Sequence, residues 1–157
     1  MKKLNLYLLL ILSVGLVTLN SCKKKKPIGD FIKDNCLKAK EVRENGTIVY
    51  TIGGASNSKP AYAKFKMVFN LPNNGVEITE TDGTVTKGTW AYSDPKISIS
   101  GLNPPLTDAA TGTNTRTTAE YTTSNYNAKT KEITLTALTK NLKVGDATIV
   151  YTMIPCE

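Results

Sequence analysis

The 157-residue chain contains no histidine. Without an imidazole, Ser-His-Asp and Cys-His catalysis are excluded, together with every metal site that needs a histidine ligand. A phosphate-binding loop, an EF-hand pattern and a fixed-period repeat are also absent. The carboxylates Glu77, Glu80 and Asp82 do cluster, but two of them occupy positions expected to face solvent or to form a turn. The sequence therefore predicts a protein that is not an enzyme and binds no metal or other cofactor.

Long apolar runs are also lacking, since a transmembrane helix needs roughly 20 apolar residues and the longest stretch here is 6–19. This stretch follows two lysines and leads into Leu-Asn-Ser-Cys at 19–22. A charged start, a short apolar stretch and a cleavage site are the parts of a secretory signal peptide. The segment resembles the type II signal peptide of bacterial lipoproteins, with its lipobox. The resemblance implies cleavage before Cys22 and lipid on its sulfur. The alternative is an ordinary secretory leader in which this cysteine is incidental.

The lipoprotein resemblance divides the chain into a signal peptide (1–21), a lipidated lysine-rich tether (22–29) and one all-β domain (30–157). Two or more acyl chains give stable anchoring, so Cys22 is expected to attach the mature protein to a membrane. In Bacteroidota lipoproteins an acidic cluster after the cysteine resembles a surface-export signal, and this chain has lysines there instead. The resemblance therefore implies the cell envelope, on the periplasmic face of the outer membrane.

Basic charge is concentrated in the tether. The chain has 20 lysines and arginines against 13 acidic residues; two of the basic residues lie in the leader and four at 23–26, which leaves 14 against 13 from residue 27 onward. The lysine run either contacts an anionic membrane surface, at about 1 kcal/mol per lysine, or is a solvated spacer. Because the domain itself has no basic patch, nucleic-acid binding is not predicted.

Cysteine is scarce, and Cys22 leaves an even pair, Cys36 and Cys156, in an exported chain. Such a pair predicts a disulfide, with two separate free thiols as the alternative. A bond across so long a loop stabilises a fold by on the order of 4–5 kcal/mol in the chain-entropy model. It requires Cα atoms about 4.4–6.8 Å apart. The start and the end of the domain are therefore expected to lie side by side.

Threonine-rich alternation, with turn signals about every ten residues, predicts an all-β domain. We expect a single antiparallel β-barrel or β-sandwich of about eight to nine strands. The predicted strands are residues 38–43, 47–52, 63–69, 76–79, 84–92, 97–100, 117–126, 132–139 and 147–154. A short helix is expected at 31–37 with Asp30 as its cap. The inward positions of strand 84–92 change phase near Gly88, which predicts a β-bulge.

Residues 101–118 contain two prolines and little alternation. A long irregular segment of this kind is usually a functional lid or a disordered stretch. Both readings, a lid and a plain surface excursion, stay open.

A second resemblance rests on the hairpin at Asp82-Gly83, on Gly88-Thr89-Trp90, and on the alternating isoleucines that follow. Together they resemble the lipocalin-like lipoproteins of Bacteroidota. The resemblance implies a barrel that holds one small ligand or is filled by its own side chains.

Two functions follow from these expectations. The first is an accessory or structural lipoprotein that binds another envelope protein through loops or an exposed strand edge; the alternative is a lipocalin-like carrier of a small apolar ligand. The residues that would line the ligand site, or simply form the core, are Phe65, Met67, Phe69, Trp90, Tyr92 and Tyr151.

Trp90 decides between these functions. We expect its ring to be wedged by side chains within a core shared with Phe65, Met67, Phe69 and Ile99, while Lys64, Lys66 and Ser98 face solvent. An open apolar cavity beside Trp90, roofed by 101–118, would instead favour the carrier.

Overall fold

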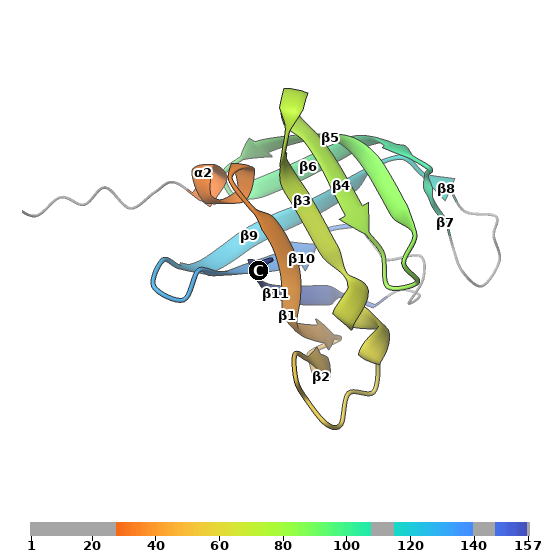
Figure 1. Ribbon diagram of the computed structural model, residues 1–157, viewed down its shortest axis with the longest axis vertical. Coiled ribbons are helices and arrows are strands. Elements are labelled where there is room, and N and C mark those ends of the chain that lie inside the picture. Colours follow the sequence, from red (N-terminus) through yellow and green to blue (C-terminus); the bar gives the residue numbers. More distant parts are fainter. Residues whose placement is uncertain (1–27, 108–114, 140–146, 157) are drawn as a thin grey trace, which may run out of the picture.

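The computed structural model of the chain describes residues 28–107, 115–139 and 147–156. Within these residues the predicted all-β class is confirmed. Eight antiparallel strands form a closed barrel and a ninth, β2, is added outside the closure (Figure 1). Because the sheet closes on itself, the structure is a barrel and not a sandwich of two sheets.

The element bounds agree with most of the predicted strands. Helix α2 spans Ile28–Lys33, and the short 3-10 helices η1 and η2 span Pro60–Lys64 and Pro72–Asn74. The barrel strands are β1 (Cys36–Glu44), β3 (Lys66–Leu71), β4 (Gly75–Thr79), β5 (Val85–Ser93), β6 (Lys96–Asn103), β9 (Ala119–Asn127), β10 (Glu132–Ala137) and β11 (Ile149–Pro155). The remaining strands are β2 (Thr47–Thr51), β7 (Leu106–Thr107) and β8 (Thr115–Arg116).

The barrel closes where β1 pairs with β11 along its whole length, from Leu37 opposite Pro155 to Glu44 opposite Ile149. On its other edge β1 has two neighbours, because its first three residues pair with β3 and its second half pairs with β2. The hairpin of β1 and β2 therefore projects from the barrel wall. Figure 1 shows β2 and the segment after it at the lower extremity of the molecule.

Alternate side chains of the barrel strands meet in one core. Phe65, Met67, Phe69, Trp90 and Ile99 are all buried in it, as the alternation predicts. Lys64 and Lys66 are exposed and Ser98 is half-buried, so the expected register is correct.

The start of the predicted strand 63–69 is wrong, because Ala63 and Lys64 belong to a short helix. Pro60 instead begins the 3-10 helix η1, and β3 starts only at Lys66. In this tighter helix Tyr62 turns inward and is buried, whereas Ala63 is exposed.

The predicted bulge exists, but it lies in the partner strand. Between the cross-strand pairs Lys87–Asn103 and Thr89–Ser100, β5 advances by two residues and β6 by three. The extra residue therefore belongs to β6. There Gly101 has a φ of +64°, a conformation that favours glycine. The inward positions of β6 accordingly move from Ile99 to Leu102. The phase change assigned to strand 84–92 was therefore wrong, because β5 keeps one alternation through Gly88.

Gly88 allows the bulged strand to approach β5 closely. A Cβ atom at this position would lie 2.6 Å from the carbonyl oxygen of Ser100 and 3.1 Å from Cδ2 of Leu102. We expect Gly88→Ala to lower the free energy of unfolding by about 1–3 kcal/mol, since a backbone carbonyl must move. Urea unfolding measures this, with Lys87→Ala on the same strand as a control that changes stability by less than about 0.5 kcal/mol. Equal stability of the two variants would show that the close approach is absent.

Helix α2 covers one end of the barrel, which we call the helix end. Phe31 and Ile32 are buried, and the Phe31 ring lies 4.8 Å from that of Tyr126. The helix begins at Ile28, two residues before the predicted domain start, and it ends before Cys36, which opens β1. The helix expected at 31–37 is thus shifted towards the start of the chain.

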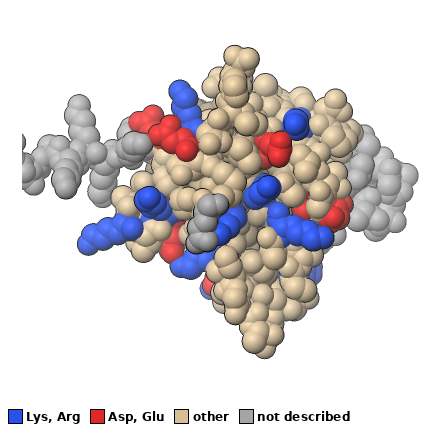
Figure 2. Space-filling model, viewed as in Figure 1, with Lys and Arg blue, Asp and Glu red and all other residues tan. Residues whose placement is uncertain are grey.

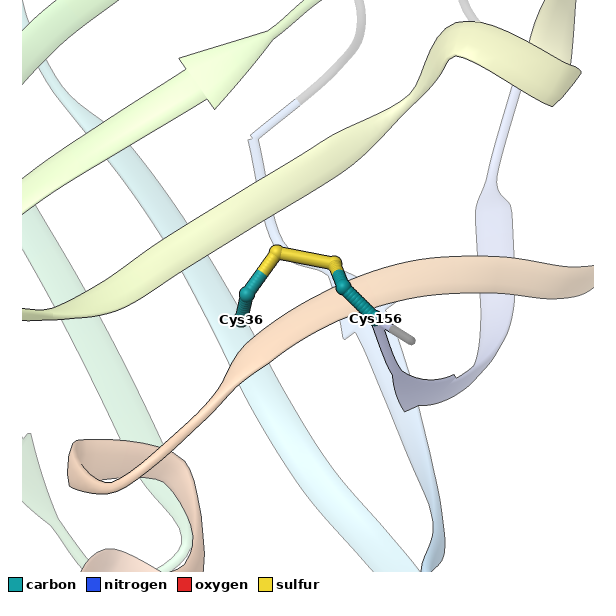
Figure 3. Close-up of a disulfide and its surroundings, with 2 residues drawn as sticks. All are labelled: Cys36 and Cys156. Carbon is teal, nitrogen blue, oxygen red and sulfur yellow. A yellow bond between two sulfur atoms is a disulfide. The ribbon is translucent and has the colours of Figure 1, made fainter.

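The predicted disulfide joins Cys36 and Cys156 at the helix end (Figure 3). Their Cα atoms lie 5.3 Å apart, and the Cys156 amide donates a hydrogen bond to the Cys36 carbonyl oxygen at 2.8 Å. The bond therefore ties the residue after β11 to the first residue of β1.

Segment 101–118 is more regular than expected. Strand β6 continues to Asn103, β7 and β8 pair as a two-stranded ribbon, and the amide of Leu102 donates to the carbonyl of Thr117 at 3.0 Å. Figure 1 shows this ribbon on the opposite side of the barrel from α2. Residues 108–114, between the two strands, lie outside the described residues.

Candidate functional site

The predicted anchor, Cys22, lies outside the described residues together with the whole leader and the tether up to residue 27. In the described part of the chain, no helix has the length and apolar character needed to cross a membrane. Also within that part, no three His, Cys, Asp or Glu side chains come together as a metal site would require.

The predicted lining residues fill the barrel. Phe65 and Tyr151 stack with their ring centroids 4.5 Å apart, and Phe69 meets Trp90 edge to face at 5.0 Å. Met67 is fully buried beside them in the same core. These side chains pack against one another, and they therefore form the core.

Tyr92 is placed differently from the other five. It is half-buried, and its hydroxyl donates to Asp94 Oδ1 at 2.6 Å and lies 3.3 Å from Thr123 Oγ1. Burial raises the pKa of Tyr92, and the hydrogen bond to Asp94 raises it further. Its ring faces α2, since a Cβ on Gly29 would lie 2.8 Å from Cδ1 of Tyr92. The Tyr92 side chain therefore packs against α2.

Trp90 is 8% exposed and borders a hollow of about 300 Å³ at the helix end. The residues that line this hollow come from α2, from Asn74 and from residues 90–92 of β5. None of them comes from segment 101–118. A second hollow of about 610 Å³ lies on the other side of Lys33 and Asn74, with Phe69 and Leu71 in its wall. Trp90 therefore packs on Phe69 in the core but borders a hollow on another side, and segment 101–118 does not roof that hollow.

A polar cluster that the sequence did not predict lies at the other end of the barrel, which we call the polar end. Glu44 accepts a hydrogen bond from the Tyr62 hydroxyl at 2.8 Å and pairs with Lys59 at 2.5 Å. Burial raises the pKa of Tyr62, and the hydrogen bond to Glu44 raises it further. Tyr62 therefore stays a neutral donor at physiological pH.

Glu80 is a buried carboxylate in the same region. Burial and the nearby Glu80 charge raise the pKa of Tyr121, which Arg116 opposes. The signal for its burial was present in the sequence, because Val76, Ile78 and Glu80 share one alternation. The burial of Glu80 was nevertheless not predicted, because the three carboxylates of this hairpin were not expected to form a site.

Several polar atoms near this end have no hydrogen-bond partner among the described residues: Thr79 Oγ1, Thr86 Oγ1 and Arg116 Nε. Thr86 is the cross-strand partner of Ile78, so it faces the interior on the same side as Glu80. The large majority of buried side-chain polar atoms in proteins have a hydrogen-bond partner, and ordered water is commonly that partner. The polar end can therefore hold water, and with no imidazole it lacks the usual general base.

The β1–β2 projection, defined here as residues 46–58, differs from the rest of the surface because none of its 13 residues is charged. Figure 2 shows the lower tip of the molecule without lysine, arginine or acidic side chains, whereas both signs of charge lie over the barrel above it. Ile48 and Ile52 of this projection are 47% and 43% exposed.

The outer edge of β2 is covered by the segment that follows it. Asn57 Oδ1 accepts from the Thr51 amide at 2.8 Å, and Asn57 Nδ2 donates to the Thr51 carbonyl at 2.9 Å. The Lys59 amide donates to the Val49 carbonyl at 3.0 Å. These bonds replace a neighbouring strand, so residues 49–51 do not offer an open strand edge for partner binding.

No protein-family model and no curated protein match the chain. The search of solved structures finds the crystal structure of an uncharacterized protein from Bacteroides eggerthii, with 9% sequence identity and a TM-score of 0.44. The similarity covers 79% of this chain and 99% of that one. The barrel is therefore defined by the strand pairing of this chain, and both resemblances, to lipoproteins and to lipocalin-like domains, stay predictions.

Proposed function

We propose that the protein is a membrane-anchored envelope lipoprotein, a non-enzymatic module that binds another envelope protein with its outer surface. The observation that carries this proposal is the packed barrel interior. Phe69 meets the Trp90 ring edge to face, and Phe65 stacks on Tyr151, so these side chains occupy the space that a carrier would leave for its ligand. A partner protein would then be bound by the outer surface of the barrel.

The position of α2 suits an anchored domain. Only five residues, 23–27, separate Cys22 from Ile28. Even fully extended, this segment spans at most about 20 Å. A lipid on Cys22 would therefore hold the helix end close to the membrane. The disulfide at the same end would keep the start of β1 attached to β11 there.

The anchor makes the first functional prediction. Cys22→Ala should leave an unprocessed, unacylated precursor, because no other residue can supply the thioether at the cleavage site. Labelling cells with a radioactive fatty acid, followed by gel electrophoresis, measures both the acylation and the change in size. We expect complete loss of label.

Cys36→Ser is the matched control, since it removes a cysteine within the domain and should keep both the label and the mature size. A Cys22→Ala protein of mature size that still pelleted with membranes would contradict the lipoprotein proposal. The packed barrel would be unaffected by that result.

A further inference from the structure

The β1–β2 projection combines exposed apolar side chains with a lack of charge. The described residues include five large apolar side chains that are markedly exposed; Ile48 and Ile52 lie on the projection, while Leu71, Val85 and Leu138 lie on three other parts of the barrel. Burying an exposed isoleucine against a partner removes apolar surface from water, at about 25 cal/mol per Å². Residues 46–58 carry no charge, and Arg43, the cross-strand partner of Ile48, is paired with Glu41, so no unpaired ionic group of this segment has to be desolvated.

The projection is also held in one conformation by its own hydrogen bonds. Asn57 binds both backbone groups of Thr51, and the Gly54 amide donates to the Thr51 carbonyl at 2.9 Å. A surface that is ordered before binding loses less conformational entropy when a partner arrives. The same bonds close the strand edge, so a partner meets side chains here and not the backbone of β2.

The projection lies away from the proposed membrane attachment. Strand β1 leaves the helix end at Cys36 and reaches Glu44 after nine residues, or about 30 Å at ~3.3 Å per residue. Figure 1 shows α2 and the projection on different sides of the molecule. A short tether at α2 therefore turns the projection towards the aqueous space.

We propose that residues 46–58 form the docking surface for the partner, and that this partner is a protein with an uncharged, apolar contact surface. The inference rests on the proposed function and deepens it. Its chemistry follows from the charge pattern, because residues 46–58 carry no charge and the charged side chains at their border are already paired, Arg43 with Glu41 and Lys59 with Glu44. A charged partner surface would lose water here and find no unpaired opposite charge at this border. Ile48 and Ile52 are the expected contacts.

Photo-cross-linking in intact cells tests this surface with the full-length, acylated protein. A benzophenone amino acid replaces Ile52, and in a matched variant it replaces Leu138, which is similarly exposed at 49% but lies outside the projection. We expect light to give one discrete protein adduct from position 52, at least tenfold stronger than from position 138. Ile48→Asp in the same chain should abolish it.

The adduct protein, once identified by mass spectrometry and purified, completes the test. We expect Ile52→Asp to weaken its binding at least tenfold, and Leu138→Asp to change it less than twofold. Both substitutions are at exposed positions, and equal Tm values confirm that each variant folds.

The other results overturn the inference in distinguishable ways. An adduct of the protein with itself would make the occupant a second copy, and an adduct with phospholipid would make it the membrane. An equally strong protein adduct from position 138, insensitive to Ile48→Asp, would keep the proposed function and move the surface elsewhere. Two further variants carry the benzophenone amino acid at Ile48 and at Val85. If all four positions gave no protein adduct, both the surface and the proposed partner binding would be rejected.

Discussion

Removal of the Cys36–Cys156 disulfide is expected to lower the free energy of unfolding by about 2–5 kcal/mol. The two cysteines are 120 positions apart, so the bond restrains most of the unfolded chain. The chain-entropy model gives on the order of 4–5 kcal/mol for such a loop, and native disulfides in small exported domains commonly contribute somewhat less. In the folded state the bond also holds β1 against β11 at the closure of the barrel.

Urea unfolding of the Cys36→Ser/Cys156→Ser double variant measures this loss. The wild-type protein in a thiol reductant should lose the same stability, and the double variant should not respond to the reductant. This second comparison is the control, because it separates the disulfide from the serine substitutions. A loss below about 1 kcal/mol would mean that the backbone pairing alone holds the two strands together.

Trp90→Ala is expected to destabilise the domain by about 3–5 kcal/mol, the usual range for truncating a buried aromatic side chain. The ring packs edge to face on Phe69 and fills the barrel near α2. Its Nε1 has no hydrogen-bond partner among the described residues, so the loss comes from packing and not from a broken hydrogen bond. Trp90→Phe should accordingly recover a large part of the stability.

Val85→Ala is the control for this series, because Val85 lies on the same strand but is 40% exposed. It should change stability by about 0.5 kcal/mol or less. Thermal unfolding of the three variants checks the order. If Trp90→Ala lost no more stability than Val85→Ala, the ring would contribute little to the packed core, and the carrier function would become the better explanation.

The parts of the fold that were predicted correctly depend on local alternation. In β3 and in the first half of β6 apolar residues recur every second position, and β5 alternates between inward and outward residues. A slip by one residue would exchange the two faces of each strand. The inward positions of Phe65, Trp90 and Ile99 therefore follow from the chain itself. The disulfide was predictable for a different reason, since two cysteines remain once Cys22 is assigned to the anchor.

The parts that were missed depend on contacts between distant segments. The bulge near Gly88 could be detected from either strand, but only the pairing of β5 with β6 assigns the extra residue to Gly101. Likewise, nothing local shows that β2 lies outside the closed barrel, because this is decided when β1 pairs with β11. At the polar end, the burial of Glu80 could have been predicted from its alternation with Val76 and Ile78. Its proximity to Tyr62 and Tyr121 arises only in the folded barrel.

The closure of the barrel by β1 and β11 also sets an order of events in folding. Strands β3 to β6 are joined to their neighbours by short turns and can form as a meander soon after they are synthesised. Strand β1 has to wait for a partner that lies more than a hundred residues later in the chain. Contacts at such separation slow folding, because the entropy of a long loop is lost before the pairing stabilises it. Strand β1 therefore keeps one open edge until the last strand has been synthesised, and in this interval the polypeptide is most exposed to aggregation.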